Sequence, residues 1–194
     1  TQPPTVRPAT DTPAPSQTAT TAPVTGARAQ LAYTVTETFR ERYRIEVIYT
    51  DGTGRRVLSD MASEPSFSPN GRQVVFYAWP GGLEVMNVDG TNRKRILDDG
   101  EAAFPAWSPS GKYIAFHSMR GDSYKFDIYI INADGSGERM LVDGEQAAWS
   151  PDSRQIVYKG CVGNNCGLMI VNFDGSGKRR LTTCAECASD GNAN

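Results

Sequence analysis

Short runs of apolar and β-branched residues alternate with polar turn residues along most of this chain. Three of these runs, residues 73–77, 113–117 and 155–159, read QVVFY, YIAFH and QIVYK. Runs of this length and composition are typical of buried β-strands. Turn residues bound each run and no helix is visible, so the pattern predicts an all-β protein built from short strands.

A Ser-Pro pair precedes each of these runs. The pairs end at Pro69, Pro109 and Pro151, which are 40 and 42 residues apart. In Ser-Pro-Xaa-Gly, proline fixes φ for the second position of a tight turn and glycine tolerates positive φ. An aromatic residue stands two positions before each proline, namely Phe67, Trp107 and Trp149. The repeat therefore predicts a strand that carries a large aromatic side chain, then a turn and a second strand.

A second motif falls between the Ser-Pro turns. Asp-Gly pairs begin at positions 51, 89, 134 and 174, and a basic strand that ends in leucine follows each pair. Asp and Gly accept the backbone angles of a hairpin turn. A unit of about 40 residues with two hairpins is typical of a β-propeller blade, whose apolar faces are buried only when blades stack. We expect Phe67, Trp107 and Trp149 to pack between the blades.

The repeats predict a propeller domain over residues 30–194, with blades over residues 30–64, 65–104, 105–146 and 147–187. Each blade is a four-stranded sheet, and the first lacks its innermost strand because nothing before Gln30 reads as a strand. Closed propellers have about four to eight blades. We therefore expect the chain to be part of a larger ring, or to be completed by another polypeptide or a second copy. An open arc or a small four-bladed ring is the alternative.

Residues 1–29 have a different composition. The first 25 residues hold eight Thr and six Pro and show no hydrophobic periodicity. Such a segment cannot bury a core, so we expect a disordered linker or stalk. Thr/Pro stalks are common outside the cell, where they carry O-glycans; a plain linker is an equal alternative. The chain has no initiator Met and no signal peptide, as expected of a processed product or a piece of a longer protein.

Composition and motifs argue against several classes of function. The formal net charge of −2 does not favour a nucleic-acid partner. No apolar run approaches the ~18 residues that span a bilayer, so we expect no direct membrane insertion by these residues. His117 is the only histidine, so neither a Ser-His-Asp triad nor a multi-His metal site can form within the chain. We expect no catalytic residue, no metal and no cofactor.

All four cysteines lie in the last predicted blade or directly after it, and they are Cys161, Cys166, Cys184 and Cys187. The stalk favours an oxidising location, so we expect disulfides, with Cys161–Cys166 and Cys184–Cys187 as the first choice among three pairings. A cross-link between the two loops is the next choice. A zinc site of four cysteines is a sharper hypothesis, because Cys-Ala-Glu-Cys has the spacing of a zinc knuckle.

Two long loops between the second and third strands of their blades are candidate binding elements. They span residues 36–44 and 119–127 and share a rim with the cysteine loops. Both mix aromatic residues with arginine, residue types enriched in binding hot spots. The candidate binding residues are Phe39, Arg40, Arg42, Tyr43, Arg120, Tyr124 and Phe126. The basic residues that recur on the last strand of each blade are expected to form a solvated edge, with an anionic-ligand stripe as the alternative.

The stretch AWSPSGKYIAF, followed by DIYIINADGSGERML, resembles the TolB-type, WD40-like β-propeller repeat, and the resemblance covers residues 30 to about 187. Phe67 in place of Trp, Ser153 in place of Gly and Tyr49 in place of Asn depart from the repeat. Similar proteins occur as periplasmic translocation factors, as stalk-tethered ectodomains and as accessory domains of peptidases. The resemblance implies binding without identifying the ligand, since propellers host many functions.

The sequence thus predicts a non-catalytic protein-binding or scaffold propeller that presents rim loops to a partner. Its resemblance implies an extracytoplasmic location, periplasmic, cell-surface or secreted, in a bacterium. The partner is another protein or further copies of the chain itself. Two alternatives remain: a structural subunit of a surface filament or envelope complex, and a regulatory propeller of an enzyme whose catalytic domain lies outside this sequence.

Overall fold

The computed structural model describes residues 20–21, 29–37, 42–120, 125–162 and 165–182. Within these ranges the chain forms sixteen strands and no helix, in four antiparallel sheets of four strands each. Successive strands are neighbours in every sheet, as the repeat predicted. The first sheet holds β1 (Thr20–Thr21), β2 (Gln30–Glu37), β3 (Arg42–Tyr49) and β4 (Arg56–Asp60). The second sheet holds β5 (Ala62–Phe67), β6 (Gln73–Ala78), β7 (Leu83–Asn87) and β8 (Lys94–Leu97).

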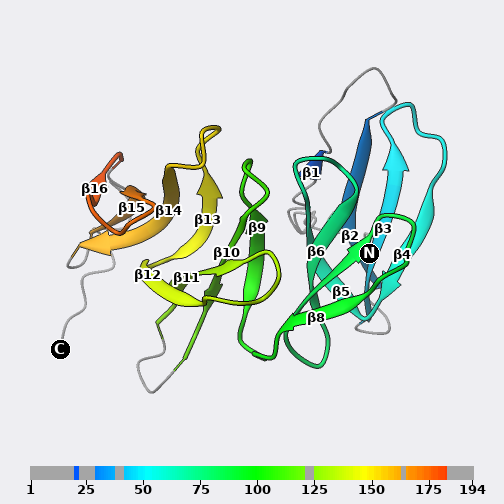
Figure 1. The fold of residues 1–194 in the computed structure, drawn as a ribbon, viewed down its shortest axis with the longest axis horizontal. Helices are drawn as coiled ribbons and strands as arrows, with labels where there is room; N and C mark the ends of the chain where they lie inside the picture. Colours follow the sequence, from blue (N-terminus) through cyan, green and yellow to red (C-terminus); the bar gives the residue numbers. More distant parts are fainter. Residues whose placement is uncertain (1–19, 22–28, 38–41, 121–124, 163–164, 183–194) are drawn as a thin grey trace, which may run out of the picture.

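The third sheet holds β9 (Ala103–Trp107), β10 (Tyr113–Ser118), β11 (Asp127–Asn132) and β12 (Arg139–Asp143). The fourth holds β13 (Glu145–Trp149), β14 (Gln155–Val162), β15 (Asn165–Asn172) and β16 (Arg179–Arg180). The sheets follow one another in chain order, and the first and last lie at opposite ends of the row (Figure 1). The described residues therefore form an open arc of blades, and the alternative of a small closed ring is not what they adopt.

The first sheet differs from the sequence expectation in one detail. We expected it to lack its innermost strand, yet the two-residue β1 pairs with β2, with Thr20 opposite Ala32 and Thr21 opposite Leu31. Strand pairing uses backbone N–H and C=O groups and needs no apolar alternation, so a pair of β-branched threonines can occupy the edge. Residues 1–19 and 22–28 of the predicted linker lie outside the described residues.

The repeated aromatic residues fill the spaces between sheets, as expected. Phe67 is 5% exposed and packs in a cluster with Ile45 and Val47 of the first sheet. Trp107 is 9% exposed and lies between apolar residues of the second and third sheets. Trp149 is partly buried between the third and fourth sheets, and its Nε1–H donates to the Ala106 carbonyl oxygen at 3.0 Å. These side chains bury the apolar sheet faces and hold the blades in their order.

The two turn motifs form as their residues require. Gly71 and Gly111 follow the Ser-Pro pairs at φ of 68° and 75°, and Ser153 takes the equivalent place at 59°. In the second motif the Asp89 carboxylate accepts the N–H and hydroxyl of Thr91, and the same bonds recur at Asp134 and Asp174. Asx turns of this kind fix the Asp-Gly hairpin in these blades.

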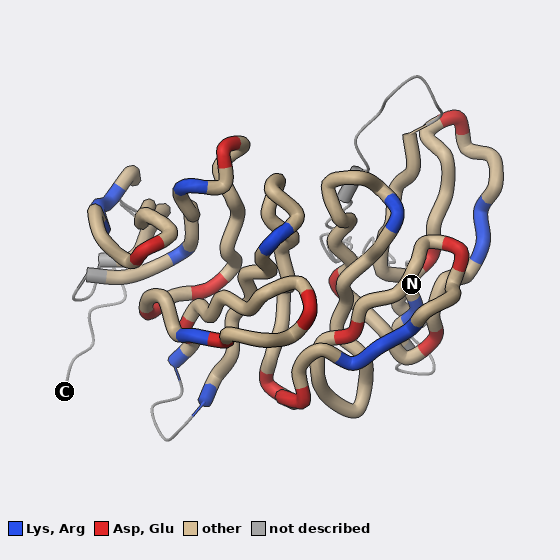
Figure 2. The backbone as a smooth tube through the Cα atoms, in the orientation of Figure 1, with Lys and Arg blue, Asp and Glu red and all other residues tan. Residues whose placement is uncertain are grey.

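Arginines of the basic outer strands form hydrogen bonds to the neighbouring blade. Arg56 of β4 donates through Nη2 to the Val88 carbonyl oxygen of the second sheet, and Arg139 of β12 donates likewise to the Phe173 carbonyl oxygen of the fourth. Each contact ties an outer strand to the next blade. Lys and Arg are interspersed with Asp and Glu along all four sheets (Figure 2). This distribution does not favour the anionic-ligand stripe that the sequence left as an alternative.

Candidate functional site

A pocket of about 310 Å³ opens on the rim where the second and third sheets meet. The β6–β7 and β10–β11 loops and the β4–β5 and β8–β9 connections all reach this rim, since strands of a meander alternate in direction. The pocket wall is rich in rings, contributed by Tyr43, Tyr77, Trp79, Phe104, His117 and Phe126. These residues come from three different sheets, so the pocket exists only when the blades are stacked.

The exposed apolar side chains concentrate at this pocket. Eight large hydrophobic residues are exposed among the described residues, and four of them line the pocket. These four are Tyr43, 48% exposed, Met61, 44%, Trp79, 58%, and Phe104, 38%. Trp79 meets Tyr77 edge to face, with ring centroids 6.1 Å apart. A group of exposed apolar side chains is typical of an interaction site, whereas single exposed apolar residues are common on any protein surface.

A repeated backbone kink shapes the inner wall. Glu64, Phe104 and Gln146 occupy one repeat position in β5, β9 and β13, and all three have positive φ, of 57°, 50° and 57°. Each lies at a β-bulge in its strand pairing. The left-handed conformation is unfavourable for residues with a Cβ, so a compensating contact is expected at each site.

That contact is a hydrogen bond to the preceding sheet. The Glu64 N–H donates to Thr34 Oγ1 at 2.9 Å, the Phe104 N–H to Glu64 Oε2 at 2.5 Å, and the Gln146 N–H to His117 Nδ1 at 2.9 Å. The bulge therefore turns one N–H per blade away from its own sheet and links neighbouring blades at the pocket. The same kink presents the side chains of Glu64 and Phe104 to the pocket.

His117 is a buried, neutral part of this wall. It is 2% exposed, and its ring packs against Phe104 and Phe126, at centroid distances of 5.1 and 4.5 Å. Burial lowers the pKa of His117 to about 4, which the Glu145 carboxylate partly opposes. Because Nδ1 accepts the Gln146 N–H, the neutral ring carries its hydrogen on Nε2. The ring of His117 is thus a packed part of the pocket wall.

Carboxylates give the pocket its charge. Glu64 and Glu101 line it, and no Lys or Arg of the described residues does. Burial raises the pKa of the Glu64 carboxyl, and the hydrogen bond from the Phe104 N–H partly opposes this. Tyr77 donates its hydroxyl to the Gly100 carbonyl oxygen at 3.1 Å; burial raises the pKa of this hydroxyl, and Glu101, Glu64 and Asp99 raise it further. The charged side chains of the described residues that line the pocket are therefore all acidic.

The structure separates the predicted binding residues into three groups. Tyr43 and Phe126 line the pocket. Phe39, Arg40 and Tyr124 lie outside the described residues, as does the side chain of Arg42, whose backbone begins β3. Sequence reasoning missed Trp79, Phe104 and Glu64. Trp79 stands in the short loop WPGG of the second blade. This loop is at the same repeat position as the long loops of the first and third blades, so the repeat could have indicated that Trp79 lies on the same rim.

Arg120, the remaining predicted binding residue, is held by other residues of the chain. Its guanidinium pairs with Asp99 at 2.6 Å and with Glu138, and it lies 4.4 Å from the Tyr129 ring centroid. These contacts fix the start of the β10–β11 loop against the β8–β9 connection. Arg120 therefore positions one side of the rim.

One of the predicted disulfides is present. Cys161 and Cys166 face each other at the ends of β14 and β15 and are bonded. Cys184 and Cys187 lie outside the described residues, so their pairing stays a prediction. A zinc site of four cysteines needs four thiolates, and the bond removes two of them. Within the described ranges, no three His, Cys, Asp or Glu side chains are grouped to hold a metal ion.

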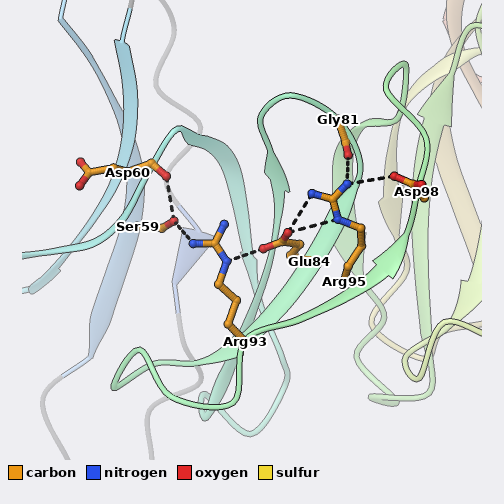
Figure 3. Close-up of polar contacts among 7 residues, drawn as sticks. All are labelled: Ser59, Asp60, Gly81, Glu84, Arg93, Arg95 and Asp98. Atoms are coloured by element: carbon orange, nitrogen blue, oxygen red, sulfur yellow. Dashed lines mark hydrogen bonds and ion pairs between the residues drawn. The ribbon is translucent and has the colours of Figure 1, made fainter.

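A second polar cluster, around Glu84 of β7, is structural (Figure 3). Glu84 is 7% exposed and pairs with Arg93 and, at 3.1 Å, with Arg95. Arg93 also donates to Ser59 Oγ of the first sheet at 3.1 Å, and Arg95 to Asp98 and the Gly81 carbonyl oxygen. Each charge in the cluster has its partner, so the cluster joins two sheets and leaves the aromatic pocket as the candidate site.

A family model for the TolB beta propeller domain matches residues 61–192. The chain belongs to the TolB β-propeller family. It is similar to the Tol-Pal system protein TolB of Rhizorhabdus wittichii, with 42% identity over 76 residues, which are 37% of this chain and 17% of that protein. No described helix of this TolB-type propeller is long and apolar enough to cross a membrane.

Solved structures show the same fold. The putative TolB from Agrobacterium tumefaciens has a TM-score of 0.69 at 19% identity, covering 79% of this chain and 61% of that one. The oligogalacturonate lyase from Vibrio parahaemolyticus has a TM-score of 0.61 at 15% identity, covering 81% and 51%. The β-propeller domain of the Trilobed protease from Pyrococcus furiosus has a TM-score of 0.55 at 13% identity, covering 84% and 57%. The chain spans less than two thirds of each of these relatives.

Proposed function

We propose that this TolB-type propeller is a non-catalytic binding or scaffold module that acts outside the cytoplasm and holds a protein partner at the rim pocket. The observation that carries the proposal is the gathering of exposed Tyr43, Met61, Trp79 and Phe104 around one recess. Aromatic residues in partly enclosed pockets dominate the binding energy of protein interfaces. The stacked sheets hold these side chains in place, so little ordering cost accompanies binding.

Two observations support the location and the kind of partner. The Cys161–Cys166 disulfide is typical of exported proteins, because thiols stay reduced in the cytosol. The curated relative is named as a protein of the Tol-Pal system, and this favours a protein as the partner. The lyase and protease neighbours, at 15% and 13% identity, support the fold alone and give no reason to assign their chemistry to this chain.

Site-specific photo-crosslinking tests the proposal. A photoreactive residue at position 79 of the exported chain is expected to capture one protein partner, identified by mass spectrometry. The matched control carries the photoreactive residue in place of Met140, which is 52% exposed on β12 and does not line the pocket. A Phe104→Ala change should weaken capture from position 79. Capture of the same proteins from both positions, or of none from position 79, would contradict the proposal.

A further inference from the structure

The rim pocket combines aromatic faces with carboxylates that meet no lysine or arginine among the residues lining it. Tyr43, Tyr77 and Trp79 supply rings, and Glu64 and Glu101 supply acids, within one recess of about 310 Å³. Pockets for small ligands usually measure about 300–1,000 Å³, so this one has room for a single side chain. Aromatic faces attract cations through the ring quadrupole, and a neighbouring carboxylate adds to the attraction.

Glu64 is a pocket carboxylate that forms no ion pair among the described residues. It stands in the left-handed conformation at a β-bulge, and its Oε2 accepts the Phe104 N–H. No Lys or Arg of the described residues forms an ion pair with it, in contrast to Glu46 and Glu84, which each pair with two arginines. Glu64 is partly buried. Withdrawing a carboxylate from water without a counter-charge is costly, and a bound cation would offset this cost.

Two described arginines near the pocket have their charges paired with other carboxylates. Arg95 is held by Glu84 and Asp98, and Arg120 by Asp99 and Glu138. His117 is a buried neutral ring whose Nδ1 is occupied by the Gln146 N–H. The only charged side chains of the described residues that line the pocket are acidic, so they would repel an anionic side chain of a partner. An apolar side chain would leave Glu64 without a counter-charge.

We propose that the pocket receives a lysine or arginine side chain of the protein partner, with its charged end at Glu64 and its stem against Trp79 and Tyr77. This inference rests on the proposed function and names the chemistry by which the partner is recognised. The long methylene stem of either residue suits the apolar rim, and the charge suits the acidic wall. The partner is thus a segment with a protruding basic residue.

Capped tripeptides provide a test that needs no knowledge of the partner. Ac-Gly-Lys-Gly-NH₂, and matched peptides with norleucine or glutamate in place of lysine, are titrated into the full chain and followed by NMR of the Trp79 indole and Phe104 amide. The lysine peptide should bind about 3- to 30-fold more tightly than the norleucine peptide, the range expected of a partly desolvated cation–π contact with a carboxylate. The glutamate peptide should not shift these signals.

Glu64→Gln keeps an oxygen for the Phe104 N–H and removes the charge, so it should reduce the preference for lysine to the smaller part that the ring faces supply. Asp143→Asn removes one charge at an exposed residue paired with Lys178, outside the pocket, and should leave the preference intact. Equal binding of the lysine and norleucine peptides, or an unchanged preference in Glu64→Gln, would overturn the inference. Absence of lysine-dependent shifts at millimolar peptide would overturn it as well.

The two proposals fail in different ways. A partner cross-linked from position 79, together with no preference for the lysine peptide, would retain protein binding and reject the basic side chain. A lysine preference that depends on Glu64, without a partner cross-linked from position 79, would retain the cationic pocket and reject the proposed function.

Discussion

His117 connects two blades through a single nitrogen. Its Nδ1 accepts the N–H of Gln146, a residue in the left-handed conformation of the next sheet, and its ring packs between Phe104 and Phe126. The unprotonated ring is required for this arrangement, because a protonated Nδ1 cannot accept a hydrogen bond. One residue thus makes the packing of the pocket depend on pH.

This dependence gives a prediction for stability. The unfolded chain protonates His117 near its ordinary pKa of 6.5, whereas the folded chain does so near pH 4. The unfolded state therefore binds more protons between these values, and the free energy of unfolding should fall as pH decreases from 7 to 4, by at most about 3 kcal/mol from this residue. His117→Asn keeps an acceptor oxygen for the Gln146 N–H and removes the titration, so it should show a smaller fall in urea denaturation at pH 7 and pH 4. Identical falls in both proteins would show that His117 is not the cause.

Between the sheets, aromatic residues at one repeat position have unequal surroundings. Trp107 is 9% exposed within the cluster that joins the second and third sheets, and Trp149 is only partly buried next to the last sheet. Trp107 lies between the second and third sheets, and each of these sheets is covered on its other face by a further blade. The seam of the last blade lacks this support within the described residues.

Trp107→Ala should accordingly destabilise the chain more than Trp149→Ala. We expect losses of about 3–5 kcal/mol for the fully packed residue and about 2 kcal/mol for the partly exposed one, because the cost follows the area and cavity left behind. Equilibrium urea unfolding of the two variants provides the measurement, and each serves as the matched control of the other. Equal losses would mean that the two seams are packed alike.

For the molecule as a whole, the last of the described sheets has one face that no other described sheet covers. In β15, Met169 and Val171 face the third sheet, so Leu168 lies on the opposite side, where it is 46% exposed. Propeller blades bury both faces against neighbours. The exposed Leu168 on this face therefore favours association with a further blade or a second copy, as the sequence expectation of a completed ring requires.

We predict that the chain self-associates in a concentration-dependent manner and that Leu168→Lys reduces this association. Analytical ultracentrifugation gives the oligomeric state, and the matched control is Met140→Lys, an exposed residue of β12. The charge placed on the end face should prevent stacking because a lysine cannot be desolvated there without a partner. A monomer at every concentration, or an equal effect of both variants, would count against stacking through this face.

The sequence predicted the blades well because their signals are local. Ser-Pro-Xaa-Gly and Asp-Gly turns fix the chain direction through the φ preferences of a few residues, and the β-branched and aromatic runs between them favour strands. The position of Trp107 in the repeat was enough to place it in a seam. The Cys161–Cys166 pairing was accessible for the same reason, because both residues belong to one hairpin.

The pocket and the edge strand β1 could not be predicted in this way. Trp79, Glu64 and Phe104 are brought together by the angle between two sheets and by bulges whose left-handed residues have no characteristic amino acid. The pairing of Thr20–Thr21 uses only backbone groups, which every residue carries. The repeat in the sequence thus determined each sheet and its order in the chain, because periodicity reflects neighbours along the chain. The site depended on contacts between sheets, because only tertiary packing decides which side chains share a surface.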